Sequence, residues 1–548
     1  SFLLHLHLEK SFSCFCLLCC FLLAAYVHAV DNSKPLLQVA SIDYATGILQ
    51  LTFNETVDVT PQPAVNQSRI GIVDASGASV GILSGATVYQ SDGTTITIKL
   101  SEEQRVQAIQ TGLRQIPSND VFTDQRFVGP GGDDAANVFD FYQGAIKDIS
   151  LNDATEQLDF ALVEAPDNTK PIIERVDVYF GVGHILFQFS ETIDMTPPSD
   201  FFLGSATIMA NINEPAHSFV LQDATIPDEN AVNITMTLSE ADRIALLRGS
   251  NMPGGRNSPV KFAIPSRVFF DMAHMPNSQD DNIPIVEHPD DISPTVTFTI
   301  LDLGTSVLTI GSSEPLNLEF LDASKLVLIN DETLNFTLEG SRIVSTAQTY
   351  DTNISIPEAL RAGLIRYTGT PGGDGKALTL NIYAGALHDM GENPMIESIN
   401  TTMTEIGDTT PPTVLNVKLK LTEGELILNM SETVDTTVAG YLTGQYAYSP
   451  FPINFDRIMV SNSGAAHDVN VSLVGATISN VSSTILVFKL TEVQRAALIQ
   501  MSGTPGGDGQ ATVLNLNEGA FHDLSVNDVV QTYGIPITEF PDTSPQTS

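Results

Sequence analysis

Apolar and polar residues alternate along most of this chain, in short runs that glycine and proline interrupt. In one clear case, an alternating run at 414–421 and an apolar run at 426–430 flank a Glu-Gly-Glu turn. Because side chains of a strand point to opposite faces in turn, such a pair of runs predicts a β-hairpin. Comparable runs occur at 70–73, 80–82, 94–100 and 485–490, which favours an all-β fold.

A longer pattern occurs four times, at 101–152, 239–277, 357–393 and 491–527. Each copy contains Glu-x-x-Arg, then Pro-Gly-Gly, and the proline precedes a later aspartate by 18 residues in every copy. A second marker, a glutamate in a Ser/Asn-Glu sequence, falls at Glu55, Glu191, Glu314 and Glu432, so the period is 118 to 136 residues. Units of that size bury their own core, which distinguishes them from solenoid repeats.

Short linkers precede the repeats at 31–35, 167–171, 290–294 and 408–412, and each runs from aspartate through small polar residues to proline. Proline fixes its own φ and extends its predecessor, so these linkers should be stiff. The segment 1–29 has an apolar stretch at 11–26 and ends in Val-His-Ala, which predicts a secretory signal peptide. We therefore divide the chain into a signal peptide (1–29), repeats 1 to 4 (30–166, 167–289, 290–407 and 408–541) and the start of a further linker (542–548).

One helical turn is expected in each repeat, directly before the Gly-rich segment. Ser101, Ser239 and Thr491 are good N-caps, and Gln104, Asp242 or Gln494 follows three residues later, which is capping-box spacing. Short strands with one helical turn predict an immunoglobulin-like Greek-key β-sandwich, and the whole chain a tandem array of four.

Charge and cysteine content narrow the function. The formal net charge is −40, with 65 acidic and 25 basic residues, so the chain should repel nucleic acid and anionic membranes and attract divalent cations. A simpler interpretation is that acidic side chains keep a secreted array soluble. All four cysteines lie within the first 20 residues, so the folded part has neither disulfides nor thiolate metal sites.

These motifs together resemble a known family. The Asp-Thr-Thr-Pro-Pro linker, the Ser-Glu-Thr-Val-Asp strand end and the closing His-Asp-x-x-x-Asn are similar to the bacterial-type immunoglobulin-like repeats of S-layer and adhesin proteins. The resemblance covers about residues 31–541, and the Pro-Gly-Gly-Asp-Gly segment departs from it. It implies a spacer, matrix or adhesion role without catalysis.

Recurrent acidic residues are the best candidate for chemistry. Strand parity brings the linker aspartate, the Ser-Glu carboxylate and the final Asp-x-x-x-Asn turn to the N-terminal pole of each repeat, facing the repeat before. Several converging oxygens are what Ca²⁺ requires. The alternative is that Asp and Asn only close turns. Repeat 2 fits least well because Asn277 lies six residues after its aspartate.

The predicted metal ligands are, in repeat 2, Asp167, Glu191, Asp194 and Asp271; in repeat 3, Asp291, Glu314, Asp389 and Asn393; and in repeat 4, Asp408, Glu432, Asp435, Asp523 and Asn527. The corresponding residues of repeat 1 are Asp31, Glu55, Asp58, Asp148 and Asn152, and Asn317 belongs to repeat 3.

The other motifs are weaker evidence for a functional site. The Pro-Gly-Gly segment follows its helical turn, whereas a phosphate loop precedes a helix, so glycine-supplied turns are the better explanation. Four arginines recur on the helical turn and are interpreted as structural ion pairs or carbonyl donors, with an anion site as the alternative: Arg105, Arg243, Arg361 and Arg495. The dyads at His388-Asp389 and His522-Asp523 are not shared by the other copies, and Gly77-x-Ser79-x-Gly81 lacks the strand–turn–helix context of a nucleophile elbow. No catalytic residue is predicted.

Nine N-glycosylation sequons are present, at Asn54, Asn66, Asn233, Asn335, Asn353, Asn400, Asn429, Asn470 and Asn480. The sequence thus predicts an extracellular, non-enzymatic structural or adhesive protein of the cell surface or matrix. Its expected partners are matrix or surface proteins or polysaccharides, with no membrane insertion after signal cleavage. Two alternatives remain: an adhesin with a site in one repeat, for which 120–129 and 441–463 are the candidate segments, and the stalk of an enzyme whose catalytic domain lies outside this sequence.

Overall fold

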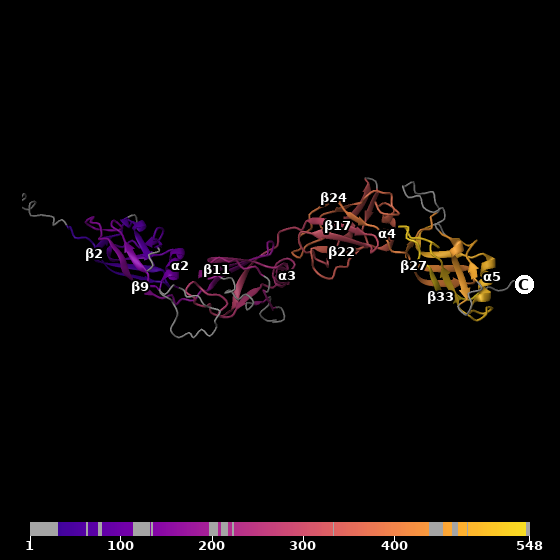
Figure 1. Cartoon of the computed structure of the whole chain (residues 1–548), viewed down its shortest axis with the longest axis horizontal. Helices are drawn as coiled ribbons and strands as arrows, with labels where there is room; N and C mark the ends of the chain where they lie inside the picture. The colour runs from indigo at the N-terminus through magenta and orange to yellow at the C-terminus, as the bar shows by residue number, and fades with distance from the viewer. Residues whose placement is uncertain are drawn as a thin grey trace, which may run out of the picture. The chain divides into compact units, whose positions relative to one another are not determined.

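The computed structural model describes residues 31–543 except 62–63, 75–78, 113–131, 133–134, 197–206, 210–217, 222–223, 332–333, 438–452, 463–469 and 479–480. The chain forms two compact units, Ser1–His288 and Pro289–Ser548, which we describe separately (Figure 1). The predicted signal peptide, the segment at 120–129 and Asn480 lie outside the described residues, as does most of 441–463.

In the first unit, one strand pattern occurs twice. Repeat 1 has strands in the order β4-β3-β7-β9-β1-β2-β6-β5, and repeat 2 has the order β13-β12-β15-β16-β10-β11-β14. The bounds in repeat 1 are β1 Leu37–Asp43, β2 Ile48–Asp58, β3 Ile70–Val73, β4 Ser79–Ile82, β5 Thr87–Val88, β6 Gly93–Lys99, α2 Glu102–Thr111, β7 Val138–Phe141, β8 Lys147–Asp148 and β9 Gln157–Ala165. Those in repeat 2 are β10 Ile173–Tyr179, β11 His184–Ile193, β12 Thr207–Met209, β13 Ser218–Val220, β14 Ala231–Thr237, α3 Glu240–Gly249, β15 Lys261–Ile264 and β16 Asp280–His288.

The second unit repeats the pattern, with orders β21-β22-β18-β17-β25 and β20-β19-β23-β24 in repeat 3 and β29-β28-β32-β33-β26-β27-β31-β30 in repeat 4. Repeat 3 contains β17 Val296–Asp302, β18 Val307–Ser312, β19 Leu326–Asp331, β20 Leu334–Thr337, β21 Arg342–Ile343, β22 Asp351–Ser355, α4 Glu358–Ile365, β23 Thr379–Ile382, β24 Ser398–Thr402 and β25 Thr404–Ile406. Repeat 4 contains β26 Val414–Lys420, β27 Glu425–Val434, β28 Ile458–Asn462, β29 Asn470–Ser472, β30 Thr477–Ile478, β31 Ser483–Lys489, α5 Glu492–Met501, β32 Thr512–Leu516 and β33 Thr532–Phe540. Short 3-10 turns occur at Gln67–Arg69, Ala323–Lys325 and Phe455–Arg457.

The last strand of a repeat joins its two sheets. In repeat 4, β33 pairs parallel with β26 near its end and antiparallel with β32 near its start. Strands β26 and β27 form the antiparallel hairpin that the sequence predicts, and Gly424 takes a φ of 64° in its turn. The inward residues of both sheets, such as Leu428 and Leu514, have no exposed surface and form one core. The chain is therefore mostly β, in sandwich-like layers, as predicted.

The helices differ slightly from the prediction. Two of the three expected capping boxes are present, at Ser101 with Gln104 and at Thr491 with Gln494. Ser239 caps its helix by accepting from the backbone N–H of Asp242. The helices are 8 to 10 residues long, which is more than the one or two turns expected. Among the described residues, no helix has the length and apolar character needed to cross a membrane.

Candidate inter-repeat joints and cation sites

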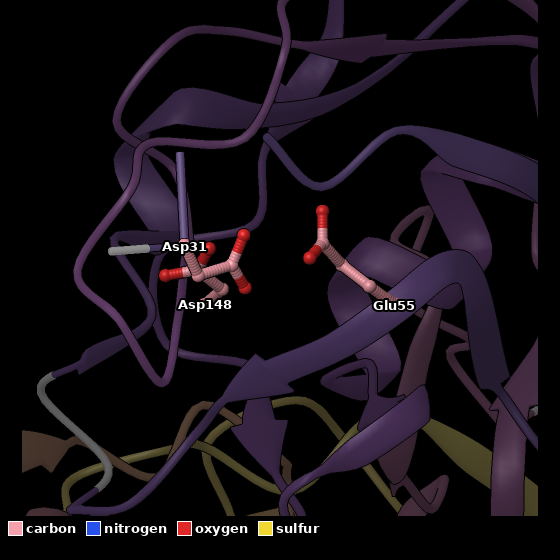
Figure 2. A group of neighbouring side chains, drawn as sticks. All are labelled: Asp31, Glu55 and Asp148. Atoms are coloured by element: carbon pink, nitrogen blue, oxygen red, sulfur yellow. The ribbon is translucent and has the colours of Figure 1, made fainter. Parts of the chain in front are cut away.

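The acidic residues of each pole meet as the sequence predicts. Linker aspartate, strand glutamate and turn aspartate each bring a carboxylate oxygen within 4.8 Å of the others, in the groups Asp31/Glu55/Asp148, Asp167/Glu191/Asp271, Asp290/Glu314/Asp389 and Asp408/Glu432/Asp523. Figure 2 shows the first group, in which Glu55 faces Asp31 and Asp148. We call this surface of a repeat its acidic pole.

In repeat 3 the linker residue of the acidic group differs from the predicted one. In repeat 3 the buried Asp290 joins Glu314 and Asp389, whereas Asp291 is exposed. Asp290 lies four residues before Pro294, which is the spacing of the linker aspartate in the other three copies. Counting back from the proline would have identified it.

Short-range contacts position the turn aspartate. In repeat 4, Asp523 Oδ1 accepts hydrogen bonds from the backbone N–H groups of Ser525 and Asn527, both at 2.8 Å. The side-chain amide of Asn527 donates to Asp523 Oδ2 at 2.8 Å and to the carbonyl oxygen of Asp408 at 3.1 Å. Asn393 makes the same contacts with Asp389 and Asp290. These two asparagines are therefore donors that tie the turn to the linker, and their role as metal ligands stays a prediction.

Asp194 and Asp435 do not join the acidic groups. Each accepts a hydrogen bond from the backbone N–H two residues later, at 3.1 Å from Thr196 and 2.9 Å from Thr437. Asp58 and Asn317 accept in the same way, from Thr60 and Glu319. These hydrogen bonds are those of the turn-closing alternative.

An arginine from the preceding repeat reaches the acidic pole of repeat 2. Arg105 of α2 donates from Nη1 to Asp167 at 2.6 Å and to the carbonyl oxygen of Tyr44 at 3.1 Å. Its Nη2 donates to Glu191 at 3.0 Å and to its own helix neighbour Glu102 at 2.7 Å, and Nε also donates to Glu102. All five guanidinium N–H groups have a partner, and only 6% of the side chain is exposed. The ion pair therefore joins repeats 1 and 2.

The second unit builds the same joint between repeats 3 and 4, where α4 contacts β27 (Figure 1). Arg361 donates to Asp408 at 2.7 Å, to Glu432 at 2.9 Å and to the carbonyl oxygen of Leu303 at 3.0 Å. Glu358 binds Arg361 and accepts from the backbone N–H of Thr433 at 2.9 Å, so contacts run in both directions. We call the helix end that carries the arginine the arginine pole.

Apolar contacts reinforce both joints. The residue after the turn aspartate, Met272 in repeat 2 and Leu524 in repeat 4, joins the hydrophobic core of the preceding repeat. In the second unit, a Cβ on Gly372 of the Pro-Gly-Gly segment would lie 2.0 Å from the carbonyl oxygen of Leu524. Gly372 also has a φ of 89°, so glycine is required there both for its backbone conformation and for the approach of the next repeat.

The carboxylates of a joint outnumber its arginine. Burial raises the pKa of Glu191 to about 7, and the charge of Asp167 adds to the effect while Arg105 opposes it. Burial raises the pKa of Asp271 to about 8, and the charge of Glu191 adds to it. At the other joint, burial raises the pKa of Glu432 to about 8, with Asp408 and Asp523 contributing. Each joint therefore has an excess of negative charge, which bound protons or a cation would neutralise.

Asp271 provides the test of whether a cation fits. It has no exposed surface, and its Oδ2 has no hydrogen-bond partner among the described residues, although it lies in the acidic group. The group offers three carboxylates, the oxygen ligands that a hard cation such as Ca²⁺ prefers, and Arg105 already donates to two of them. Asp167, Glu191 and Asp271 are the residues that would hold it, and the ion would neutralise charge that Arg105 leaves over.

Comparisons with known proteins assign this chain to no family. No family model matches it, and no curated protein matches it. Solved structures that resemble it include the S-layer protein SbsC, residues 31–844 (10% identity, 93% of this chain and 54% of that chain, TM-score 0.17). The N-terminal part of SbsC matches at 11% identity over 37% of this chain and 45% of that one, with a TM-score of 0.16. The four N-terminal immunoglobulin domains of Dscam1 isoform 6.44 match at 9% identity over 93% and 100%, with a TM-score of 0.13. The chain spans about half the length of the two SbsC structures.

The remaining candidates of the sequence behave as turns or core. Asp374 of the Gly-rich segment accepts from the backbone N–H of Lys376 at 2.9 Å, so it closes a turn. His388 stacks on Phe320 with ring centroids 4.0 Å apart, and His522 is buried. Neither histidine forms an ion pair with a described carboxylate. Of the sequons within the described residues, all have an exposed asparagine except the half-buried Asn353 and Asn429.

The sequence did not reveal the partners of the arginines. They recur in all four copies, which marks them as part of the shared unit, and an ion pair was expected. That the pair crosses to the next repeat follows only from where the helix ends in space.

Proposed function

We propose that this protein is a non-catalytic, secreted structural component of a cell surface or extracellular matrix, in which arginine–carboxylate joints hold successive repeats in fixed orientation. The observation that supports this proposal is the repetition of one joint at Arg105 and at Arg361, with the same partners and nearly the same distances. A buried, fully satisfied guanidinium restricts rotation about a linker far more than a surface ion pair does.

The test measures orientation directly. Residues 290–543, which contain repeats 3 and 4, are compared as wild type and Arg361→Ala by NMR relaxation of backbone amides. A fixed joint gives both repeats one rotational correlation time, and Arg361→Ala should give two shorter ones. Arg495→Ala, at the far end of repeat 4, is the matched control and should leave tumbling unchanged. Independent tumbling of wild-type repeats would refute the spacer role.

We further propose that Ca²⁺ occupies the acidic poles and adds to their stability. Support comes from the groups of three carboxylates and from the surplus of carboxylates over arginine. Thermal unfolding of residues 290–540 with calcium and with a chelator tests it, since an ion that binds only the native state raises its stability. Asp408 and Glu432 also bind Arg361, so Asp523→Asn is the cleaner variant. If calcium does not change the melting temperature, arginine and bound protons alone balance the charge of the carboxylates.

A further inference from the structure

Two of the nine sequons occupy the same place in the fold of repeats 3 and 4. Asn335 pairs with Ile329 in the β19–β20 hairpin, and Asn470 pairs with Ser461 in the β28–β29 hairpin. Ile329 and Ser461 are each the fourth residue of a strand that directly follows a 3-10 turn. The two asparagines therefore hold one position in the strand pairing, although the loops that precede them differ in length.

This position lies in the outermost strand of a sheet. The strand orders begin β20-β19 in repeat 3 and β29-β28 in repeat 4, and no described strand pairs with the other side of β20 or β29. Neither strand contains proline, lysine or arginine, which commonly protect such an edge. The unpaired backbone groups of an unprotected edge can form hydrogen bonds with a strand of another chain.

Repeats 1 and 2 show that the hairpin does not require asparagine at this position. The corresponding hairpin pairs Val73 with Ser79 in repeat 1 and Met209 with Ser218 in repeat 2. Neither serine belongs to a sequon. Because the same hairpin forms without them, the asparagines of repeats 3 and 4 need an explanation other than the strand pairing itself.

The asparagine of each sequon is accessible in the folded chain. Asn335 and Thr337 are both exposed and lie on one face of β20, because side chains of a strand alternate. Asn470 is also exposed, and its Oδ1 accepts from the hydroxyl of Ser461, to which Asn515 Nδ2 donates at 2.6 Å. That contact with Ser461 uses the amide oxygen of Asn470, whereas a glycan is attached to the amide nitrogen.

We propose that Asn335 and Asn470 carry N-linked oligosaccharides, which cover the edges at β20 and β29 and prevent these strands from pairing with another chain. The donor is a polyprenyl diphosphate-linked oligosaccharide of the secretory pathway. The amide nitrogen forms a bond to C1 of the first sugar, and the bond from C1 to the diphosphate oxygen breaks. One amide proton is lost, and the polyprenyl diphosphate leaves. The proposal rests on the proposed secretion of the chain and is independent of its joints.

Glycopeptide mass spectrometry tests the modification. Residues 31–548 are secreted from a eukaryotic host under a signal peptide of that host, so the result does not depend on the segment 1–29. The peptides that contain Asn335 and Asn470 should be glycosylated in most molecules. An unmodified peptide at either position would overturn the proposal. The tumbling experiment on Arg361→Ala measures the joints alone, so failure of the joints and failure of the modification can be told apart.

Sedimentation velocity tests the effect of the glycans. The double variant Thr337→Ala/Ser472→Ala removes both sequons and keeps both asparagines, and it should form oligomers whose share grows with protein concentration. The wild type should stay monomeric. Thr56→Ala is the matched control, because it removes the sequon of Asn54 in β2, a strand that pairs with β1 on one side and β6 on the other. This control should sediment like wild type.

A conservative variant separates the glycans from the two hydroxyl side chains. Thr337→Ser/Ser472→Thr changes both residues but retains both sequons, so it should be glycosylated and monomeric. Thermal melts of all variants establish that they are folded. A folded Thr337→Ala/Ser472→Ala variant that stays as monomeric as wild type, or a Thr56→Ala control that associates equally strongly, would overturn the role of the glycans at the edges.

Discussion

The joint between repeats 1 and 2 and the joint between repeats 3 and 4 share their arginine and differ at one aspartate. Asp523 has an asparagine four residues later, whose amide donates to it. Asp271 has Met275 at that position, and Asn277 instead accepts from the backbone of Val268 at 2.8 Å. In both joints an arginine thus pairs with equivalent carboxylates, but the remaining negative charge is balanced differently.

The difference shows that the arginine ion pair alone does not balance the whole charge of the carboxylates in a joint. Asn527 supplies a donor to the carboxylate and ties the turn to the linker, whereas Asp271 Oδ2 is buried without a donor. A proton or a cation must then reduce the repulsion, and burial with the charge of Glu191 accordingly raises the pKa of Asp271 to about 8. The first joint should therefore respond more to pH and cations than the second.

Removing the arginine should have the largest effect. Arg361→Ala leaves Asp408 and Glu432 buried without their cation, and loss of one partner of a buried pair costs about 3–5 kcal/mol. Denaturant unfolding of residues 290–543 should show that loss, partly as a splitting into two transitions. Arg495→Ala, which is more exposed, should cost about 1 kcal/mol or less. Equal losses would mean that the joint contributes nothing beyond a surface pair.

Asp271→Asn should stabilise the first unit, in contrast to most changes of a buried residue. The amide removes one negative charge and offers a donor to Glu191 or Asp167, and relieving an unsatisfied buried acceptor is worth about 1–3 kcal/mol. The measurement is the melting temperature of residues 31–288 at pH 8. A lower melting temperature would indicate that the Asp271 carboxylate is needed. Repeating the melt with a chelator would show whether it is needed as a cation ligand or for another reason.

The pH dependence has a definite sign. Glu191 and Asp271 have pKa values of about 7 and about 8 in the folded unit, above the usual 4.5 and 3.8, so the folded state holds more protons than the unfolded state. Their stabilising contribution is complete below about pH 4 and is lost as the pH rises to about 8. Each group contributes at most about 1.4 kcal/mol per pH unit. Asp271→Asn should flatten this fall in a pH series of unfolding free energies, and an unchanged slope would contradict the assignment.

Asn527→Ala should have the smallest effect, a loss of about 1 kcal/mol at most, because Asp523 keeps its two backbone donors. This variant should also make the second joint resemble the first. Its unfolding free energy should depend on pH more strongly than that of wild-type residues 290–543, in which the pKa of Glu432 is already raised to about 8. A calcium titration should show whether Asp523 Oδ2, once it has lost its amide donor, binds an ion. If neither appears, the contrast between the joints has another origin.

Local sequence signals predicted much of the fold. Alternating runs, the Gly424 turn and the caps at Ser101 and Thr491 depend on neighbouring residues, and each formed as predicted. The acidic groups were also predictable, because strand parity decides which ends of Glu432 and Asp523 meet. Asp291 was misassigned where two aspartates adjoin and only the distance to proline distinguishes them.

The elements, the repeat and the convergence of carboxylates at one pole could be predicted, since they follow from spacing along a chain with fixed periodicity. Tertiary structure alone decided that Arg105 and Arg361 cross to the next repeat, that Asn527 donates, and that Gly372 makes room for Leu524. These contacts join residues from two repeats that each fold on their own core, so their pairing depends on how two finished surfaces meet, and no local pattern specifies that.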